Sequence, residues 1–140
     1  MELVWTEQLS VGNALIDSEH QQIVHVINSV EQAFIAMDRT NLLHSLKLLL
    51  DSMRNHFRNE ERIARTVGFS FDEHSLSHQY MLKKLEHVKN GLTVESETLP
   101  EGMFEHITGL LRSWLIDHVV KEDMLMKPVL KNYPYDFSPG

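Results

Sequence analysis

Four stretches of this chain carry apolar residues at alternating steps of four and three, the spacing that lines one face of an α-helix. The stripes begin at Ile16, Leu42, Phe71 and Met103, and polar turn residues or glycine separate them. Each helix must bury its apolar face against a neighbour, and short connections favour antiparallel neighbours. The pattern therefore predicts an all-α fold, an antiparallel up-down-up-down four-helix bundle.

The ends of the predicted helices carry start and stop signals. Asp17 or Ser18 can cap the first helix, and Gly68 is placed to end the second in the left-handed conformation. Pro128 limits how far the fourth helix continues without a kink. We expect one domain over 1–140, with an N-terminal arm at 1–15, helices at about 17–37, 41–67, 71–91 and 100–126, and a short C-terminal extension.

Composition narrows the class of function. The formal net charge of −7 argues against a nucleic-acid or anionic-membrane binder, which needs a basic face. The absence of cysteine excludes a disulfide framework, a thiolate metal site and a cysteine nucleophile. The N-terminal sequence lacks the basic and apolar regions of a signal peptide, and no apolar run is long enough to cross a membrane. The expected location is the cytoplasm.

Histidine interrupts every one of the four apolar stripes. The chain has 9 histidines, and those in the stripes are joined by a carboxylate, Glu60, one helical turn after His56. Burying an unpaired carboxylate in a bundle core is costly, and a structural network of so many buried polar groups is hard to satisfy. Neutral imidazole and carboxylate are natural metal ligands, and bundles build metal sites from inward side chains on facing helices. The pattern therefore predicts a metal site that includes His20, His56, Glu60, His74, His78 and His118.

Asp123 is a further candidate ligand whose position breaks the helical pattern. It follows His118 by five residues, which places it about 140° around an ideal helix from that histidine. A one-residue π-bulge between them would bring both side chains to the bundle interior. We therefore expect the α-helical hydrogen bonding to be interrupted within 114–124.

The other residues that could take part in a site are interpreted as surface, supporting or core-packing residues. Glu61 follows Glu60 but points about 100° away from it, which favours a solvated or supporting role over a ligand role. The methionines are more typical of core packing than of a cofactor site. The remaining histidines lie off the stripes and are expected at the surface: His25, His44, His87 and His106.

The residues in these stripes match the motifs of a known family. The sequence reads D-S-E-H ending at His20, H-F-R-N-E-E from His56, H-S-L-S-H from His74 and H-V-V-K-E-D from His118. In order and spacing the chain resembles hemerythrin, specifically the bacterial single-domain form, over nearly its whole length, including Trp5 in the arm. One departure is the V-G-F sequence after the second helix, where many relatives carry a Tyr-Pro turn, and it touches no ligand.

The resemblance implies a non-heme di-iron centre with a bridging oxo or hydroxo group and O2 as its ligand. One iron would have three histidines and the other two, so the second iron keeps an open coordination position where O2 binds. Both irons would share two bridging carboxylates. By this resemblance the first iron would be bound by His74, His78 and His118, and the second by His20 and His56. The bridging carboxylates would be Glu60 and Asp123.

An open position of this kind needs apolar walls, because water and protons would otherwise reach the bound ligand. Leu115 is the leading candidate for lining it, since it precedes His118 by about one helical turn. For the other candidates ordinary core packing is the competing interpretation. The full set of candidates for the O2 pocket is Leu115, Ile23, Val24, Phe57, Trp114 and Val119.

The implied function is reversible O2 binding, for carriage, storage or delivery, rather than catalysis. A ligand set rich in imidazole, without a Glu-x-x-His pair, favours binding of O2 over its use in oxidation. The alternatives are a sensor of O2, nitric oxide or redox state acting on a partner, a di-iron redox enzyme, and a structural site for another metal such as zinc. The expected partners are O2 and an oxygen-consuming or signalling protein, with the oligomeric state left open and a monomer allowed.

Overall fold

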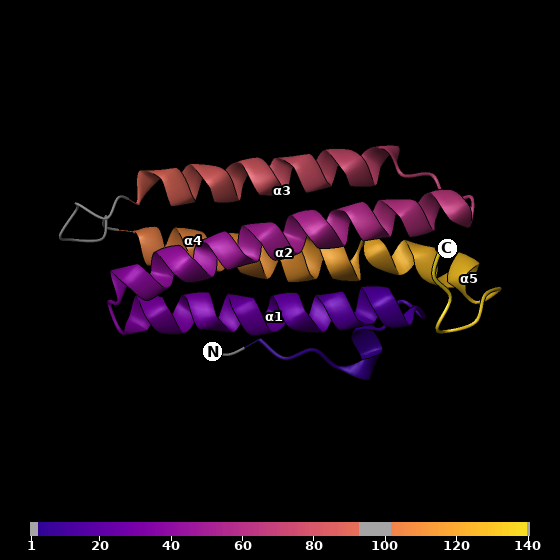
Figure 1. Ribbon diagram of the computed structural model, residues 1–140, viewed down its shortest axis with the longest axis horizontal. Coiled ribbons are helices and arrows are strands. Elements are labelled where there is room, and N and C mark those ends of the chain that lie inside the picture. The colour runs from indigo at the N-terminus through magenta and orange to yellow at the C-terminus, as the bar shows by residue number, and fades with distance from the viewer. Residues whose placement is uncertain (1–2, 93–101, 140) are drawn as a thin grey trace.

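The structure is a computed structural model in which residues 3–92 and 102–139 are described. Its four long helices run alternately in opposite directions (Figure 1), and no strand is found in the described residues. The predicted all-α four-helix bundle is therefore confirmed. The elements in chain order are η1 (Glu7–Leu9), α1 (Ala14–Ile35), α2 (Arg39–Thr66), α3 (Asp72–Gly91), α4 (Met103–Ser113), η2 (Trp114–Val120), η3 (Asp123–Met126) and α5 (Lys127–Leu130).

The apolar core consists of two clusters. The larger one fills most of the bundle and includes Ile23 and Phe57. The smaller one lies near the start of α1 and includes Ile16, Ile63 and Met126. Along each helix, the histidines and carboxylates predicted as ligands lie where the residues of one cluster give way to those of the other. The polar residues singled out by the sequence therefore form a layer inside the core.

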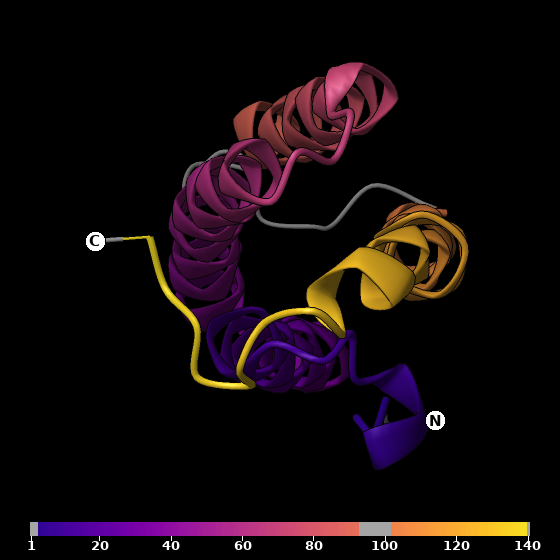
Figure 2. The same ribbon diagram turned by 90° about the vertical axis from the view of Figure 1, so that its right-hand side faces the viewer.

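The four helices are not packed equally. The most extensive interface joins α1 to α2, while α3 packs on α2 and α4 packs on α1. Contacts between α3 and α4 are sparse, and Figure 2 shows these two helices standing apart on one side of the bundle. The bundle therefore has a closed side and an open side.

The helix ends differ from the sequence-based expectation at α1. This helix begins at Ala14, and its cap is Asn13, whose side chain accepts a hydrogen bond from Ile16 N. The prediction that Asp17 or Ser18 caps the helix was wrong. Asp17 is fully buried and its carboxylate accepts hydrogen bonds from Val11 N at 2.9 Å and Tyr135 Oη at 2.9 Å. Asp17 therefore fastens the N-terminal arm and the C-terminal segment to α1.

The other helix ends were closer to expectation. Gly68 has φ +77° directly after α2, as predicted, and Phe69 N bonds to Ala64 O at 2.8 Å in a Schellman-type ending. The expected start of the fourth helix near residue 100 lies outside the described residues. Pro128 lies in the first turn of α5, where a missing N–H costs little. The chain therefore ends its fourth helix in several short segments rather than in one.

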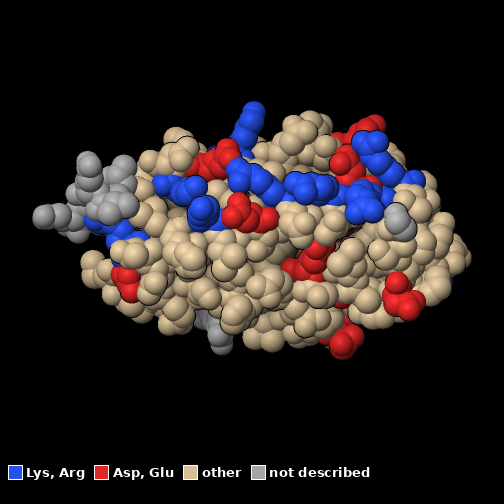
Figure 3. All heavy atoms as spheres, viewed as in Figure 1, with Lys and Arg blue, Asp and Glu red and all other residues tan. Residues whose placement is uncertain are grey.

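The surface carries charges of both signs. Lys and Arg side chains gather in a band along one face, with acidic side chains beside them (Figure 3). Exposed ion pairs join Arg54 to Asp51 and to Glu86, and Arg65 to Glu61. Such exposed pairs contribute little to stability. In the described residues, no helix is long and apolar enough to span a membrane.

Candidate metal centre

We call α4, η2 and η3 together, Met103–Met126, the fourth helical segment. The predicted ligands converge where α1 and α3 begin and where α2 and the fourth helical segment end. All are buried, although each is a polar or charged side chain. They therefore meet in a layer largely shielded from water. The exposed fractions are 0% for His20, His56, Glu60 and Asp123, 4% for His74 and His78, and 6% for His118.

Glu60 lies between two groups of histidines. Its Oε2 atom is 2.9 Å from His56 Nε2 and 3.8 Å from His20 Nε2. Its Oε1 atom faces the other way and lies 3.6 Å from His78 Nε2. Each oxygen of this carboxylate therefore serves a different group of imidazoles.

Asp123 is arranged in the same manner. Its Oδ2 atom is 3.1 Å from His20 Nε2, and its Oδ1 atom is 3.3 Å from both His74 Nε2 and His118 Nε2. The imidazoles thus divide into a two-histidine group (His20 and His56) and a three-histidine group (His74, His78 and His118). The two carboxylates stand between the groups.

This arrangement fits a pair of cations. Candidate ligand atoms of His20, His56, Glu60 and Asp123 lie within 4.8 Å of one another, as do those of Glu60, His78, His118 and Asp123. Both carboxylates belong to both sets. Many of these atoms also lack any hydrogen-bond partner among the described residues. The orphaned atoms are His20 Nε2, His56 Nε2, His74 Nε2 and all four carboxylate oxygens of Glu60 and Asp123.

Leaving so many buried polar atoms unpaired costs on the order of 1–3 kcal/mol each. The Nε2 atoms of His78 and His118 face each other at 2.8 Å, a pair in which only one nitrogen can donate. Iron can instead be bound through the lone pairs of imidazole nitrogens and carboxylate oxygens. The residues present therefore fit two metal ions better than they fit a hydrogen-bond network.

The predicted irregularity in the fourth helix is confirmed. Residues Trp114–Val120 form a π-helix, and the segment Asp123–Met126 is a 3-10 helix. The π-helix is longer than the single bulge expected and begins before His118. Its wider turns bring residues five apart closer to one face. As a result His118 and Asp123 both point into the core.

A partly buried hydrogen-bonding partner of His56 was not predicted from the sequence. His56 Nδ1 lies 3.0 Å from Glu19 Oε1. The Glu19 carboxylate also accepts hydrogen bonds from Asn59 Nδ2 at 2.7 Å and Asn55 Nδ2 at 3.2 Å. Such a carboxylate fixes the ring orientation and strengthens the imidazole as a ligand. The adjacency of Glu19 to His20 in sequence gave no signal that it serves the histidine of another helix.

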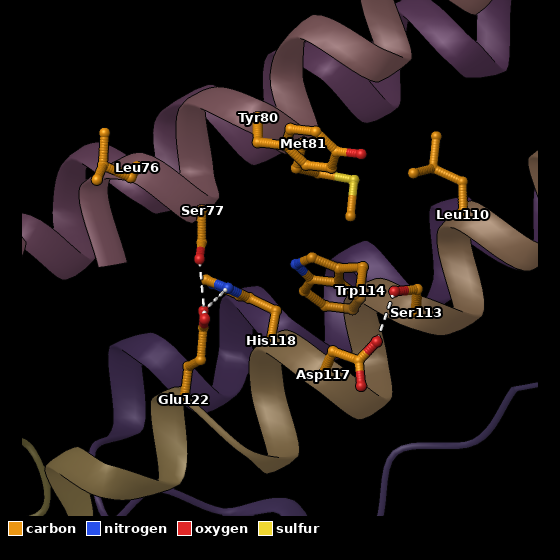
Figure 4. Close-up of a pocket in the computed structure, with 10 residues that line it drawn as sticks. All are labelled: Leu76, Ser77, Tyr80, Met81, Leu110, Ser113, Trp114, Asp117, His118 and Glu122. Atoms are coloured by element: carbon orange, nitrogen blue, oxygen red, sulfur yellow. Dashed lines mark hydrogen bonds and ion pairs between the residues drawn. The ribbon is translucent and has the colours of Figure 1, made fainter. Parts of the chain in front are cut away.

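His118 has a comparable partner nearer to the surface. Its Nδ1 atom lies 2.8 Å from Glu122 Oε2, and Ser77 Oγ donates to Glu122 Oε1 at 2.8 Å (Figure 4). The side chain of Glu122 is 34% exposed, against 15% for Glu19. The i, i+4 spacing of His118 and Glu122 is the signal that could have identified this pair.

His56 and His78, one histidine from each group, differ in charge before any metal binds. Burial acts to lower the pKa of His56, but the negative carboxylates of Glu19 and Glu60 beside its ring outweigh it and raise that pKa to about 10. At His78 burial dominates and lowers the pKa to about 2. Burial would raise the pKa of Glu60, but the imidazoles of His20 and His56 close to its carboxylate hold it well below its usual range. A cation at the two-histidine group must therefore displace a proton.

The candidates for the O2 pocket occupy different positions. Trp114 is fully buried and meets His20 edge-on, with ring centroids 5.8 Å apart. Phe57 instead stacks on His78 at 3.8 Å, so it lies against the three-histidine group. Leu115 is only partly buried and packs against the larger core cluster. The remaining candidates are buried in that cluster: Ile23, Val24 and Val119.

The four histidines outside the stripes take no part in the centre. His25, His44, His87 and His106 are all exposed, as predicted. Glu61 is half-buried and pairs with Arg65 rather than with a histidine. The surface positions predicted for these four histidines are therefore confirmed.

Comparison with known proteins agrees with this geometry. A family model described as the hemerythrin HHE cation binding domain matches residues 11–130. A bacteriohemerythrin of Pseudomonas aeruginosa is 25% identical over 122 residues, which cover 86% of this chain and 76% of that protein. A bacteriohemerythrin of Stenotrophomonas maltophilia is 23% identical over 137 residues, which cover 97% of this chain and 86% of that protein. A hemerythrin-like protein of Naegleria gruberi is 28% identical over 126 residues, covering 90% and 92%.

Solved structures show the same fold. A leucine-to-tyrosine mutant of hemerythrin matches with a TM-score of 0.78 at 20% identity, covering 93% of this chain and 98% of that one. A leucine-to-alanine mutant matches with a TM-score of 0.77 at 20% identity, covering 91% and 96%. Because the family model spans most of the sequence, the chain belongs to the hemerythrin family, whose members bind non-heme iron, and it has bacteriohemerythrins among its relatives.

Proposed function

We propose that the chain binds O2 reversibly at a di-iron centre, as an oxygen carrier, storage or delivery protein. The observation that carries the proposal is the position of two carboxylates between unequal groups of imidazoles. Glu60 and Asp123 would bridge the irons. The three-histidine group would hold one iron and the two-histidine group the other. When bound, the reduced pair of irons would supply reversible uptake of O2.

The unequal number of histidines in the two groups supports an O2 site at the two-histidine group. Both groups share the same two carboxylates, so the two-histidine group offers one protein donor fewer. Fewer protein donors leave an open coordination position for an exogenous ligand. Trp114 stands edge-on to His20 at this side and is 0% exposed, so its indole helps to exclude water there. We infer that the open position belongs to the iron beside His20 and His56.

The protein residues favour binding over oxidation chemistry. Five imidazoles against two carboxylates make a nitrogen-rich set, whereas carboxylate-rich sets with Glu-x-x-His pairs are those of the ferritin-like di-iron proteins. The apolar residues around the centre limit access of water and acid. A non-enzymatic role is therefore the one that we propose.

The experiment is anaerobic reconstitution with ferrous iron, followed by admission of air and recording of the visible absorption spectrum. We expect two irons per chain and a charge-transfer band that appears with O2 and disappears under vacuum. Absence of iron uptake would refute the proposal. A band that appears but never reverses, with peroxide released, would instead favour a redox enzyme.

A sensor acting on a partner protein is the second candidate. It is favoured by Glu122, which bonds His118 and is itself partly exposed, so the surface is linked directly to the centre. A sensor would give the same band but would also change the surface around Glu122. Hydrogen exchange of the described segment Trp114–Val120, with and without O2, tests this: unchanged exchange excludes the sensor.

A further inference from the structure

A cavity of about 480 Å³ opens between α3 and the fourth helical segment, on the open side of the bundle. We call it the α3–α4 groove, and Figure 4 shows its walls. Its volume falls within the range of small-molecule sites and is far larger than a single water, which takes about 30 Å³. Leu76, Tyr80 and Met81 line the α3 wall, and Leu110, Trp114 and Asp117 line the opposite wall.

The buried end of the groove holds an unpaired hydrogen-bond donor. Trp114 is 0% exposed, and its Nε1 atom has no acceptor among the described residues. Figure 4 shows this nitrogen on the side of the indole that faces α3. A buried donor without an acceptor is costly, so the groove favours a molecule that presents an acceptor to it.

Apart from the exposed Tyr80 hydroxyl, the other polar groups named below are already paired with one another. Ser77 donates to Glu122, which also bonds His118. Ser113 Oγ donates to Asp117 Oδ2 at 2.8 Å. The Trp114 indole N–H is therefore the polar group that a ligand has to satisfy.

The walls also specify the shape and charge of the ligand. Tyr80 and Met81 lie across from Trp114 (Figure 4), so a flat ring in the groove can contact an aromatic side chain and a thioether, with the indole at its buried end. Leu76 and Tyr80 are 67% and 62% exposed, apolar surface that a ligand would cover. Asp117 and Glu122 line the groove, and no Lys or Arg is among its described lining residues, which disfavours an anion.

We propose that the α3–α4 groove binds a neutral, planar aromatic molecule whose carbonyl oxygen accepts a hydrogen bond from Trp114 Nε1. This site is distinct from the proposed position for O2, because His118 and Trp114 stand between the groove and the carboxylates of the centre. The proposal does not depend on iron, since the groove and the unpaired donor belong to the protein alone.

The test uses three probes of similar size and the full chain loaded with zinc, which is free of redox chemistry. Coumarin is neutral, planar and carries a carbonyl. Naphthalene lacks the acceptor, and coumarin-3-carboxylate adds a negative charge. We expect coumarin to bind about threefold to tenfold more tightly than naphthalene, the value of one neutral hydrogen bond. We expect the carboxylate to bind at least about tenfold more weakly than coumarin.

Binding is measured by calorimetry and by the two indole N–H signals of Trp5 and Trp114 in the nitrogen-15 NMR spectrum. Coumarin should shift the Trp114 signal and leave the Trp5 signal in place. Tyr80→Ala should weaken binding up to about tenfold through loss of the ring contact. Leu110→Trp should fill the groove and abolish binding. The matched control for Tyr80→Ala is Ile35→Ala. It removes an apolar side chain that is 65% exposed at the C-terminal end of α1 and does not line the groove.

Four results would overturn the proposal. They are failure of coumarin to bind at millimolar concentration, a shift of Trp5 instead of Trp114, equal binding of the anionic probe, and unchanged binding in Tyr80→Ala. The Tyr80 side chain is mostly exposed, so this variant keeps the test valid if Leu110→Trp does not fold. Loss of coumarin binding with intact O2 binding would refute this site and leave the proposed function standing.

Discussion

Helices α1 and α2 form the closed half of the bundle, and α3 with the fourth helical segment forms the open half. Both halves contribute ligands, but they support them differently. In the closed half, Glu19 holds His56 and is itself held by two asparagines. In the open half, Glu122 holds His118 at the edge of a groove, with one serine to support it.

The helices differ in the same way. Through the ligand region α1 and α2 are uninterrupted, whereas the fourth helix changes to π and then to 3-10 geometry around His118 and Asp123. The two halves of the bundle therefore contribute differently to the centre. The regular half carries the two-histidine group on uninterrupted helices, and the irregular half brings in the second carboxylate and has the groove beside it.

The largest effect is expected from the carboxylates that both halves share. Glu60→Ala removes oxygens facing both histidine groups, so at least one of the two irons should be lost and affinity for the other should fall more than about 100-fold. Iron per chain after anaerobic loading is the measurement. Glu61→Ala, the adjacent carboxylate that pairs with Arg65, is the control and should keep both irons. Retention of two irons in Glu60→Ala would contradict a shared carboxylate.

The supporting carboxylates should show the difference between the halves directly. Glu19→Ala should lower zinc affinity by about 10- to 100-fold, because His56 is fully buried and loses its charged partner. Glu122→Ala should lower zinc affinity by less than about tenfold, since water can reach the position that this partly exposed side chain leaves. Competition with a chelator measures both affinities. Equal losses would remove the distinction between a closed and an open half.

Proton release should also distinguish His56 from His78. With its pKa raised to about 10, His56 is protonated at neutral pH in the metal-free protein, while His78, with its pKa near 2, is not. Zinc uptake should therefore release a proton from the two-histidine group, and the apparent affinity there should rise up to about tenfold per pH unit from pH 7 toward 10. Calorimetry in buffers of different ionisation enthalpy counts the protons. Affinity independent of pH over this range would contradict the assignment.

The same pKa shifts set opposite trends in the stability of the metal-free protein. The raised pKa of His56 contributes stability that is complete below pH 6.5 and is lost as the pH rises through about 10. The lowered pKa of His78 contributes stability that is present above pH 6.5 and is lost as the pH falls toward 2. Urea unfolding of the metal-free chain at several pH values should therefore show a maximum near pH 6.5, and His56→Asn should flatten its alkaline side.

The smallest effect is expected at Leu115, which is only partly buried. Leu115→Ala or Leu115→Tyr should speed the irreversible loss of the oxygen-dependent absorption band several-fold, because the apolar shielding beside His118 is changed. The decay of that band in air is the measurement. Leu125→Ala, at a position 61% exposed on η3, is the control. Unchanged decay would remove Leu115 from the lining of the O2 pocket.

The fold and the candidate ligands were predictable because both depend on local spacing. Steps of four and three place His20 or His56 on the same face as the apolar core residues, and that face must be buried. Asp123 was predictable only as an exception, because a simple helix would have pointed it away from His118. The exception correctly indicated a π-helical segment.

The features that the sequence did not reveal depend on how distant elements meet. Glu19 supports a histidine on α2, Asp17 fastens the arm and the C-terminal segment, and both appear in the sequence as ordinary residues near a helix start. The α3–α4 groove depends on how far apart two helices stand, a distance that no periodic pattern encodes. Local spacing therefore predicts the ligands, whereas their supports require the assembled bundle.

The central claim is a pair of irons divided unequally between two halves of one bundle. Anomalous diffraction at the iron absorption edge, from crystals of the anaerobically reduced protein, tests it most directly. The account predicts two peaks, one beside His74, His78 and His118 and the other beside His20 and His56, with Glu60 and Asp123 between them. A single peak, or two peaks with equal numbers of histidines, would contradict it.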